Sequence, residues 1–444
     1  MEILIIGGIA AGMSTAAKAL RTNKNAKVTV VEQEDYVSFG ACGLPYFIGG
    51  QFDDENNMYA RTPKQMLDAG VNLLLKHRAE RIDFKNKQVI VKDLDKDKLK
   101  TLSYDRLMIA TGASAIKPKM DGIESKNVYT VTKPYIVREL VKNLDSYKKV
   151  VVVGGGFIGV EVAEQLAHLN KEVDLLHSRE FIMEGVYDKE LSKLLTKALI
   201  ESGVNFIPES KAVGLKVEDG VVTGVKTKDH TYKADAVIIA VGFKPNTKFL
   251  DNQLESIDNG AIIIDKYGQT SIKDVFAAGD CATIPHRLAG NEYIPLATYA
   301  NKLGRIIGEN IVSDKEKWQQ FNGALGSSSI KVGAYEAVVT GLTEDLANKF
   351  NYKVNTTLIQ ANNHSNYYPN QEKITIKLVY DKETFVLYGA QIFGPSEAVL
   401  RGTGLSVAVY AGLTTKDLGF LDFAYSPPFA STWEAINIAA NTAK

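Results

Sequence analysis

The chain has 444 residues, of which 45% are hydrophobic and 23% charged, so it can bury a large core and we expect two to four domains. Its 52 Lys and Arg residues balance 52 Asp and Glu, which argues against general binding to nucleic acid or to a membrane surface. The opening apolar run stops at Gly7, too early to cross a bilayer, and no basic leader precedes it. We therefore expect a cytoplasmic protein.

The chain has two cysteines, Cys42 and Cys281, which are too few for a disulfide framework. In a reducing compartment a sparse cysteine is either an inert core residue or a reactive thiol. The six histidines show no ligand spacing and the cysteines lie far apart in the sequence, so no metal site is predicted.

The N-terminal residues predict one βαβ unit, with strands at 2–6 and 28–31 and a helix over 10–20. Gly7 and Gly12 frame the first turn, although Ile9 stands where a dinucleotide fingerprint has its second glycine. Glu32 ends the second strand, where its carboxylate can accept hydrogen bonds from an adenosine ribose. The alternative is a βαβ core without a ligand.

A second unit follows, with strands at 150–153 and 173–176 around a helix over 161–169. Its turn carries the full fingerprint, in which the first glycine makes the tight turn, the second admits a pyrophosphate and the third lets helix and strand approach closely. These are Gly154, Gly156 and Gly159. Each unit is followed by a strand that ends in a glycine turn, which adds three candidate cofactor-binding residues: Thr111, Gly112 and Gly242.

The second strand of this unit ends in His177 and Arg179 instead of the acidic residue that grips the ribose of NAD. A carboxylate would repel the 2′-phosphate of NADP, whereas these two side chains can neutralise it. We therefore expect NADPH to be used, with NADH tolerated. The alternative is that both side chains are solvated loop residues.

From about residue 321 onward, alternating segments such as 373–380 predict an antiparallel sheet in a separate α+β domain.

Segment 270–282, which contains Gly279 and Asp280, resembles the FAD-dependent pyridine-nucleotide disulfide oxidoreductases of glutathione-reductase-like fold. The resemblance places Asp280 on the flavin ribitol. A helix opening near Ala297 would direct its N-terminal dipole at the flavin pyrimidine. Cys281 is then a buried bystander.

The resemblance implies an α/β fold with two Rossmann-like dinucleotide-binding domains and a C-terminal α+β dimerisation domain. The FAD-binding domain would comprise residues 1–115 and 248–320, and the NAD(P)-binding domain residues 116–247. The interface domain would comprise residues 321–444. The expected assembly is a homodimer.

The segment containing Ser38, Phe39, Cys42, Pro45 and Tyr46 resembles the Ser-Phe-x-x-Cys-x-x-Pro-Tyr signature of the coenzyme A-disulfide reductase branch, whose substrate would contact the serine and phenylalanine. Proline suits the first turn of a helix, so the cysteine would lie at a helix N-terminus, where thiolate is favoured. The family's usual second cysteine is missing nearby, which rules out an internal active-site disulfide. The alternative is a small core residue.

Two C-terminal segments resemble those that bring tyrosines across the dimer interface in this branch. By that resemblance Tyr367 and Tyr425 act as general acids toward the departing coenzyme A thiolate, although plain interface packing and an exchange of Tyr367 with Tyr368 remain alternatives. Arg21 and Arg61 are candidates to meet the phosphates of coenzyme A, and each is equally well explained as a surface arginine.

The expected reaction passes a hydride from NADPH or NADH to FAD and then reduces coenzyme A disulfide at Cys42, with covalently bound coenzyme A on that cysteine as one resting state. The main alternative is an NADH oxidase that reduces oxygen to water through a Cys42 sulfenic acid. The absence of a histidine from residues 9–12 and the tyrosine segments argue against it. A persulfide or polysulfide reductase and a non-catalytic flavin redox sensor are further alternatives.

Overall fold

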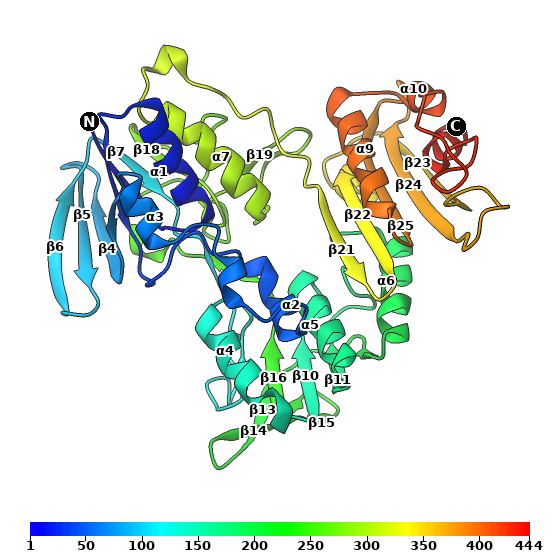
Figure 1. Cartoon of the computed structure of the whole chain (residues 1–444), viewed down its shortest axis with the longest axis horizontal. Coiled ribbons are helices and arrows are strands. Elements are labelled where there is room, and N and C mark those ends of the chain that lie inside the picture. The colour runs from blue at the N-terminus through cyan, green and yellow to red at the C-terminus, as the bar shows by residue number, and fades with distance from the viewer. The chain divides into compact units, whose positions relative to one another are not determined.

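The computed structural model describes residues 1–444 and divides the chain into two compact units (Figure 1). Both units are discontinuous in sequence because the chain leaves each one and returns to it. The first consists of Met1–Gly43, Phe52–Ala115 and Phe243–Ala324, and the second of Leu44–Gln51, Ile116–Gly242 and Leu325–Lys444.

The first unit is built on a parallel five-stranded sheet with the strand order β18-β7-β1-β2-β3. Its strands are β1 (Glu2–Ile6), β2 (Lys27–Val31), β3 (Asn72–Leu74), β7 (Arg106–Ile109) and β18 (Val275–Ala277). The central strand β1 is buried on both faces, as expected for parallel strands covered by helices. The predicted first βαβ unit is confirmed, and its helix α1 extends over Ala10–Thr22.

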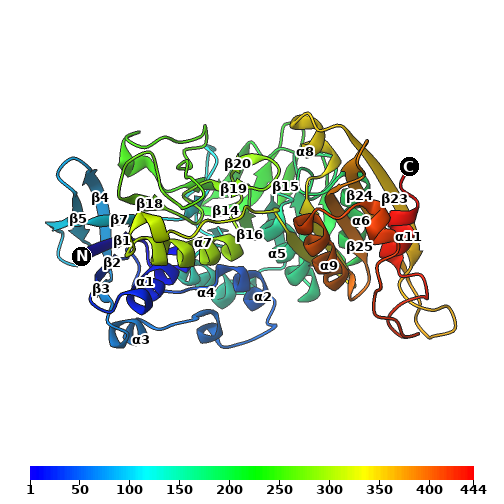
Figure 2. The same ribbon diagram turned by 90° about the horizontal axis from the view of Figure 1, so that it is seen from above.

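Helix α1 packs closely against α7 (Ala297–Asn310), and the two lie side by side in Figure 2. Gly304 makes this approach possible, because a Cβ there would lie 2.5 Å from the backbone oxygen of Ala11. Thr15 reinforces the contact by donating a hydrogen bond from its hydroxyl to the backbone oxygen of Gly304 at 3.0 Å. The segment that begins at residue 297 is thereby fixed beside the first glycine turn.

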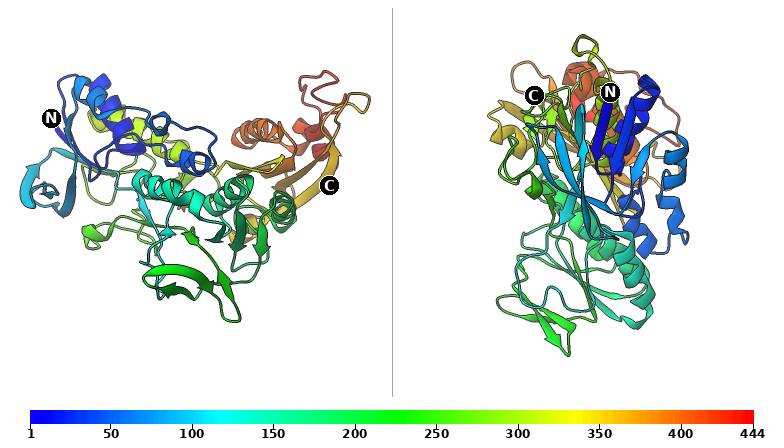
Figure 3. Two further views of the ribbon diagram at one scale, coloured as in Figure 1. Left: turned by 60° about the horizontal axis from the view of Figure 1, so that its bottom comes forward. Right: turned by 90° about the vertical axis from the view of Figure 1, so that its left-hand side faces the viewer.

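Smaller elements complete the first unit. An antiparallel sheet, light blue in Figure 3, is formed by β4 (His77–Asp83), β5 (Gln88–Asp93) and β6 (Lys98–Ser103). Two antiparallel pairs join β8 (Ala113–Ala115) to β17 (Phe243–Pro245) and β19 (Ile284–His286) to β20 (Gly290–Glu292), and helix α3 covers Pro63–Asp68.

The second unit contains another parallel five-stranded sheet, with the order β12-β11-β10-β16-β9. Its strands are β9 (Val128–Tyr129), β10 (Lys149–Val153), β11 (Glu172–Leu176), β12 (Asn205–Ile207) and β16 (Ala236–Ile239). Its helices are α2 (Leu44–Ile48), α4 (Pro134–Asn143), α5 (Phe157–His168) and α6 (Lys189–Glu201), and a meander is formed by β13 (Gly214–Glu218), β14 (Val221–Lys226) and β15 (Thr231–Lys233). The second predicted βαβ unit is confirmed, with α5 beginning four residues earlier than expected.

The C-terminal part of the second unit is an antiparallel sheet with the order β21-β22-β25-β24-β23, which confirms the predicted α+β domain. Its strands are β21 (Ser328–Val332), β22 (Tyr335–Gly341), β23 (Val354–Asn362), β24 (Lys373–Asp381) and β25 (Leu387–Gly394). Its helices are α8 (Glu344–Lys349), α9 (Ala398–Ala411), α10 (Thr415–Gly419) and α11 (Ala435–Asn441). In Figure 1, α9 covers β22 and β25.

No helix in the structure is both long enough and apolar enough to span a bilayer.

Candidate active site and cofactor sites

The glycine turn of the first unit joins the carboxyl end of β1 to α1. Gly7 has a φ of +106°, and a Cβ there would collide with the backbone oxygen of Ala110. A Cβ on Gly12 would likewise collide with the backbone oxygen of Gly7. The turn is held from the second strand by Glu32, which is 5% exposed and accepts a 2.6 Å hydrogen bond from the amide of Gly8. The expected nucleotide turn is thus built around a buried carboxylate.

Two further segments reach the same end of the sheet. The amide of Ala110 donates to the backbone oxygen of Ile6, which places Thr111 and Gly112 next to the turn. The hydroxyl of Thr111 donates to the backbone oxygen of Asn246 at 2.8 Å. On the other side, Gly279 lies against helix α1, with a Cβ position 3.3 Å from the side chain of Ala11.

Asp280 follows Gly279 and is largely shielded from water. Burial raises the pKa of its carboxyl, and no cation or hydrogen bond offsets that effect. The hydroxyl of Tyr293 donates to the backbone oxygen of Asp280 at 3.0 Å and fixes the turn. A desolvated carboxylate without a protein partner suits a neutral polyhydroxyl ligand that donates hydrogen bonds.

Cys281 is fully buried, and its thiol donates to the backbone oxygens of Ala278 and Ile109 at 3.4 and 3.5 Å. Burial raises the pKa of this thiol, so the reactive thiolate is disfavoured. The interpretation of Cys281 as a buried bystander agrees with its position.

These features together fit a flavin dinucleotide. The glycine turn has no room for side chains, the buried Glu32 carboxylate follows the second strand, and no hydrogen bond from the protein reaches the Asp280 carboxylate. Helix α7 begins at the exposed Ala297 without a side-chain cap, so its first amides are open to a ligand.

The turn of the second unit has the same construction. Gly154 has a φ of +116°, and a Cβ there would meet the backbone oxygen of Ala240, while Gly159 faces the backbone oxygen of Gly154. Gly156 caps helix α5, and no heavy atom lies within 4 Å of its Cβ position. The space beside Gly156 is what a pyrophosphate needs to approach the helix N-terminus. Gly242 follows β16 and is exposed, and its backbone oxygen accepts from the amide of Ile116.

His177 stands at the end of β11 and accepts a 3.1 Å hydrogen bond at Nδ1 from the amide of Gly155. Burial lowers the pKa of this histidine, and the nearby Arg179 lowers it further, so the imidazole is neutral at pH 7. With Nδ1 engaged as an acceptor, the proton of the neutral ring resides on Nε2. The exposed Arg179 donates to the backbone oxygen of Glu184 at 2.7 Å, which leaves the other guanidinium nitrogens for a ligand.

Cys42 lies in the short 3₁₀ turn Ala41–Gly43, which runs directly into α2. Its side chain is exposed, so the alternative of a small core residue is wrong. Pro45 is the second residue of α2, as expected for a proline in the first turn of a helix. No disulfide joins Cys42 to Cys281. The thiol is therefore positioned at the start of a helix and open to a substrate.

The other residues expected to contact the substrate differ from one another in burial and in hydrogen bonding. Phe39 is 7% exposed and packs between Tyr36 and Tyr59, with ring centroids 5.4 and 5.1 Å away. Ser38 has a φ of 54° and its amide donates to the backbone oxygen of Gly8, which ties the cysteine segment to the first glycine turn. Arg21 and Arg61 are both exposed. Arg21 lies in the last turn of α1, roughly 16 Å along the helix from its first residue at 1.5 Å per residue.

Tyr367 and Tyr425 lie together on the interface domain, although 58 positions separate them in sequence. Their hydroxyl oxygens are 3.2 Å apart, and the two side chains are 71% and 47% exposed. The hydrogen bond with Tyr425 lowers the pKa of Tyr367, and the same bond raises the pKa of Tyr425. Tyr368 instead packs against His364, with ring centroids 5.5 Å apart.

Sequence reasoning missed Glu161, which lies in α5 two residues after Gly159. Its carboxylate accepts a 3.4 Å hydrogen bond from the hydroxyl of Tyr46, the residue that follows Pro45 in α2. Burial raises the pKa of Glu161 to about 7, and Glu164 adds to the rise, whereas the bond from Tyr46 opposes it. One signal in the sequence could have identified Glu161: it is an acidic residue within the otherwise apolar first turns of the helix that follows the glycine fingerprint.

Comparison with known proteins identifies the family. Residues 1–304 match the family described as pyridine nucleotide-disulphide oxidoreductase, and residues 327–436 match its dimerisation domain. The chain belongs to the pyridine nucleotide-disulphide oxidoreductase family, as its resemblance predicted. It is therefore an oxidoreductase of the NAD(P)H-dependent, FAD-containing flavoprotein class.

The particular relatives carry two kinds of activity in their names. The chain is 32% identical to an NADH oxidase of Enterococcus faecalis over 445 residues, covering 100% of this chain and 99% of that protein. It is 35% identical to an NAD(P)H coenzyme A polysulfide/persulfide reductase of Pyrococcus horikoshii over 448 residues, covering 100% and 98%. The crystal structure of reduced Bacillus anthracis CoADR-RHD superposes with a TM-score of 0.94 at 29% identity, covering 99% of this chain and 79% of that one.

The raised pKa of Glu161 predicts a specific pH dependence of stability. Between its ordinary pKa of 4.5 and about 7, the folded chain retains a proton that the unfolded chain has released, so rising pH favours unfolding in this window. The Glu161→Gln variant should lack this loss, which amounts to at most about 3.4 kcal/mol. Urea unfolding of both proteins at pH 5 and pH 8 measures the difference. The exposed Glu172→Gln change is the control, and an identical pH dependence in wild type and Glu161→Gln would contradict the prediction.

Proposed function

We propose that this protein is a homodimeric NAD(P)H-dependent reductase that reduces coenzyme A disulfide at Cys42. The observation that carries the proposal is the exposed thiol at the start of α2, while the second cysteine of the chain is buried and joined to it by no disulfide. Because Cys281 is buried, a disulfide of Cys42 needs a sulfur from outside the chain. The CoADR-RHD structure and the coenzyme A-dependent relative favour coenzyme A as the source of that sulfur.

The proposed cycle involves two exchanges at the Cys42 sulfur. The thiolate attacks one sulfur of coenzyme A disulfide, forms a mixed disulfide with that half and releases the other half as a thiolate. Two electrons from NAD(P)H then cleave the mixed disulfide, release the second coenzyme A and restore the Cys42 thiolate. One NAD(P)H and one proton are consumed for two thiols formed.

The proposed FAD site is the cradle of Gly7, Glu32, Thr111, Asp280 and the start of α7. FAD, when bound, accepts a hydride from the nicotinamide and passes the electron pair on to sulfur. The residues of this chain would bind FAD and orient it. Glu32 accepts from the ribose, Asp280 accepts from a ligand hydroxyl, and the first amides of α7 favour negative charge beside them.

Replacing the reactive cysteine should abolish the proposed activity. Cys42→Ser should lower the rate of NADPH-dependent coenzyme A disulfide reduction by roughly a thousandfold or more, because no thiolate forms the mixed disulfide. Cys281→Ser is the matched control, since its hydroxyl can keep the bonds of a buried thiol. Intact-mass measurement of the unreduced proteins should show a coenzyme A adduct on the control and none on Cys42→Ser. Full turnover by Cys42→Ser would sink the proposal.

A second copy of the chain is proposed to complete the site through the tyrosine pair. Exposed apolar residues on the outer face of α9 support a partner, because Leu400, Val407 and Tyr410 are 72%, 66% and 41% exposed in a helix of the dimerisation domain. The lowered pKa of Tyr367 makes its phenol a better proton donor. We infer that Tyr367, assisted by Tyr425, protonates the departing coenzyme A thiolate at the Cys42 of the second copy.

Removing one hydroxyl tests this role. Tyr367→Phe should lower kcat for coenzyme A disulfide about a hundredfold, in line with the loss of a general acid, while reduction of the flavin by NADPH stays unchanged. Tyr368→Phe is the matched control, because that neighbouring ring packs on His364. Stopped-flow absorbance separates the two half-reactions. If Tyr368→Phe and not Tyr367→Phe lost activity, the two tyrosines would have exchanged roles.

The proposed cofactor is NADPH, with NADH as a weaker substitute. The proposal rests on a neutral His177 and an exposed Arg179 where a carboxylate would repel the 2′-phosphate. The Nε2 proton of His177 can donate to a phosphate or ribose oxygen.

Changing these side chains should separate the two cofactors. Arg179→Ala should raise the KM for NADPH about 10- to 100-fold, the worth of one charged hydrogen bond, and leave the KM for NADH within about twofold. His177→Asp should shift the preference toward NADH. Steady-state kinetics with both cofactors measure this, with exposed Lys193→Ala of α6 as the control. Equal losses for NADPH and NADH would contradict a phosphate-binding role.

An NADH oxidase is the second candidate, favoured by the full-length similarity to the Enterococcus faecalis enzyme. Here the Cys42 thiolate would reduce peroxide to water through a sulfenic acid. The similarity to the Pyrococcus horikoshii enzyme supports a persulfide or polysulfide substrate in the same way. Oxygen uptake with NADH alone, together with an oxygen adduct on Cys42, would favour the oxidase. A sensor without turnover would show no bleaching of the flavin by NADPH.

Three other expectations remain proposals. The FAD domain is assigned residues 1–115 and 248–320, the NAD(P) domain residues 116–247 and the interface domain residues 321–444. Ser38, Phe39, Arg21 and Arg61 are proposed to contact the substrate, the arginines through the phosphates of coenzyme A. A cytoplasmic location is proposed because a thiolate catalyst needs a reducing compartment.

A further inference from the structure

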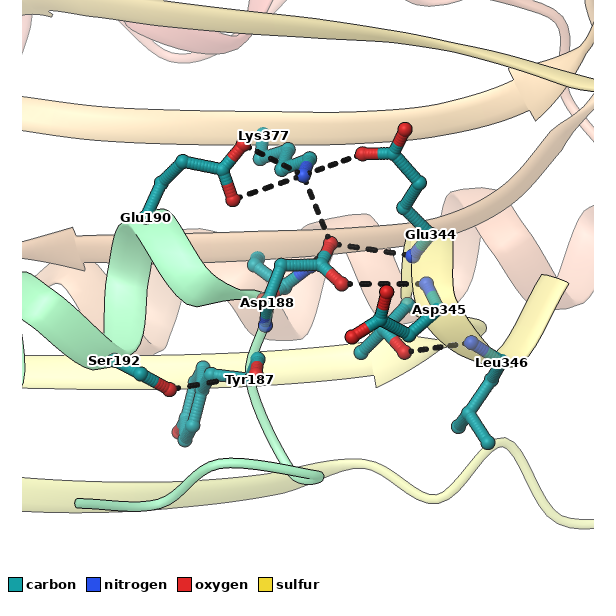
Figure 4. Close-up of polar contacts among 10 residues, drawn as sticks. Tyr187, Asp188, Glu190, Ser192, Glu344, Asp345, Leu346 and Lys377 are labelled. Carbon is teal, nitrogen blue, oxygen red and sulfur yellow. Dashed lines mark hydrogen bonds and ion pairs between the residues drawn. The ribbon is translucent and has the colours of Figure 1, made fainter. Parts of the chain in front are cut away.

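Lys377, in the middle of β24, is a buried cation among three carboxylates (Figure 4). Its side chain is 2% exposed, and Nζ lies 3.1 Å from Asp188, 3.1 Å from Glu190 and 2.7 Å from Glu344. Burial alone would lower the pKa of Lys377, but the surrounding carboxylates outweigh it and raise the pKa above its ordinary value. The ammonium is therefore charged in the folded protein and holds three anions together.

Asp188 is the most strongly fixed member of this cluster. It is 3% exposed and accepts hydrogen bonds from Gln391 Nε2 at 2.6 Å and from the amides of Glu344 and Asp345 at 3.2 and 3.4 Å. Its own amide donates to Gln391 Oε1 at 2.8 Å. Both the backbone and the side chain of Asp188 are thus tied to the sheet and the α8 turn of the interface domain.

Asp188 also ends the cofactor-recognition loop, defined here as residues 177–188, which begins at the end of β11 and leads into α6. Two hydrogen bonds tie the loop to the glycine turn before α5, called the phosphate turn here. The amide of Gly155 donates to Nδ1 of His177, and the amide of Met183 donates to the backbone oxygen of Gly155. Its amide at Ile182 donates to Thr196 of α6 at 3.1 Å. Asp188 anchors the end of this loop, five residues after Met183, so displacing it would strain segment 184–188 and, through Met183, the bond to Gly155.

We propose that Lys377, acting through Asp188, is a positioning residue that holds the cofactor-recognition loop in register with the phosphate turn. The inference deepens the proposed function, since it rests on His177 and Arg179 binding the 2′-phosphate of NADPH. Without the ammonium, the buried Asp188 carboxylate would have no counter-charge and would be repelled by the partly exposed Glu190 and Glu344. Asp188 would move toward solvent, and the loop would follow.

The first experiment measures nucleotide binding. Lys377→Met removes the charge and keeps an unbranched side chain that is one atom shorter. We expect its Kd for 2′,5′-ADP to rise about tenfold, because a loop displaced by about 1 Å misplaces His177 and Arg179. The kcat at saturating NADPH should change less than about threefold, which distinguishes positioning from general loss of the catalytic machinery. Lys197→Met is the matched control. This lysine is exposed on α6 and forms an ion pair with the exposed Glu201.

The second experiment does not depend on the cofactor. Hydrogen exchange of the ligand-free holoenzyme should show faster exchange at the amides of Phe181, Ile182 and Met183 in Lys377→Met, with β10 unchanged. Unchanged exchange in the loop would overturn the inference. Faster exchange in the loop of a protein whose wild type does not bind 2′,5′-ADP would keep the positioning role and reject the NADPH proposal instead.

A milder variant covers the case in which Lys377→Met does not fold. Asp188→Asn keeps the size of the side chain and a single acceptor oxygen while it removes the charge that faces Lys377. It should produce the same direction of change in 2′,5′-ADP binding and in loop exchange. Wild-type binding and exchange in Asp188→Asn would count against the inference.

Discussion

The structure depends on the close approach of two backbone segments at the carboxyl end of each parallel sheet. The glycine that follows the first strand lies against the carbonyl that follows a neighbouring strand, Gly7 against Ala110 and Gly154 against Ala240. No side chain fits between them, so the helix that follows can start close to the sheet and present its first amides to a ligand. Residues from distant parts of the chain, such as Thr111 and Asp280, come to the space beside the first turn, where the proposed ligand would bind.

The two cysteines differ in their surroundings, and the proposed redox cycle depends on this difference. Cys281 is enclosed by backbone carbonyls, and its raised pKa keeps it as a thiol. Cys42 is exposed at the start of a short helix. Because Cys281 is buried, the proposed cycle passes its electron pairs from Cys42 to a sulfur or oxygen species that comes from outside the chain. The choice of that acceptor is what separates the relatives named as oxidases from those named as reductases.

The sequence predicted the parts of the fold that repeat a local pattern. Apolar strands followed by glycine turns placed both βαβ units, and the exposed position of Cys42 agrees with the small residues around it. Glu161 was missed because its raised pKa comes from burial beneath a helix that lies more than a hundred residues earlier in the chain. Lys377 shows the same limit, since an alternating strand predicts a solvated lysine, whereas α6 and α8 bring three carboxylates over it. Such long-range placement leaves no local signature.

The two glycine turns also share one acceptor position. The second residue of each turn donates its amide to the residue that ends the neighbouring strand, Gly8 to Glu32 in one unit and Gly155 to His177 in the other. One acceptor is a carboxylate and the other a neutral imidazole, and both leave the turn geometry intact. The side chain at this position can therefore change from an anionic to a neutral acceptor without a change in the turn, and the proposed difference between the two nucleotide sites would rest in part on this single exchange.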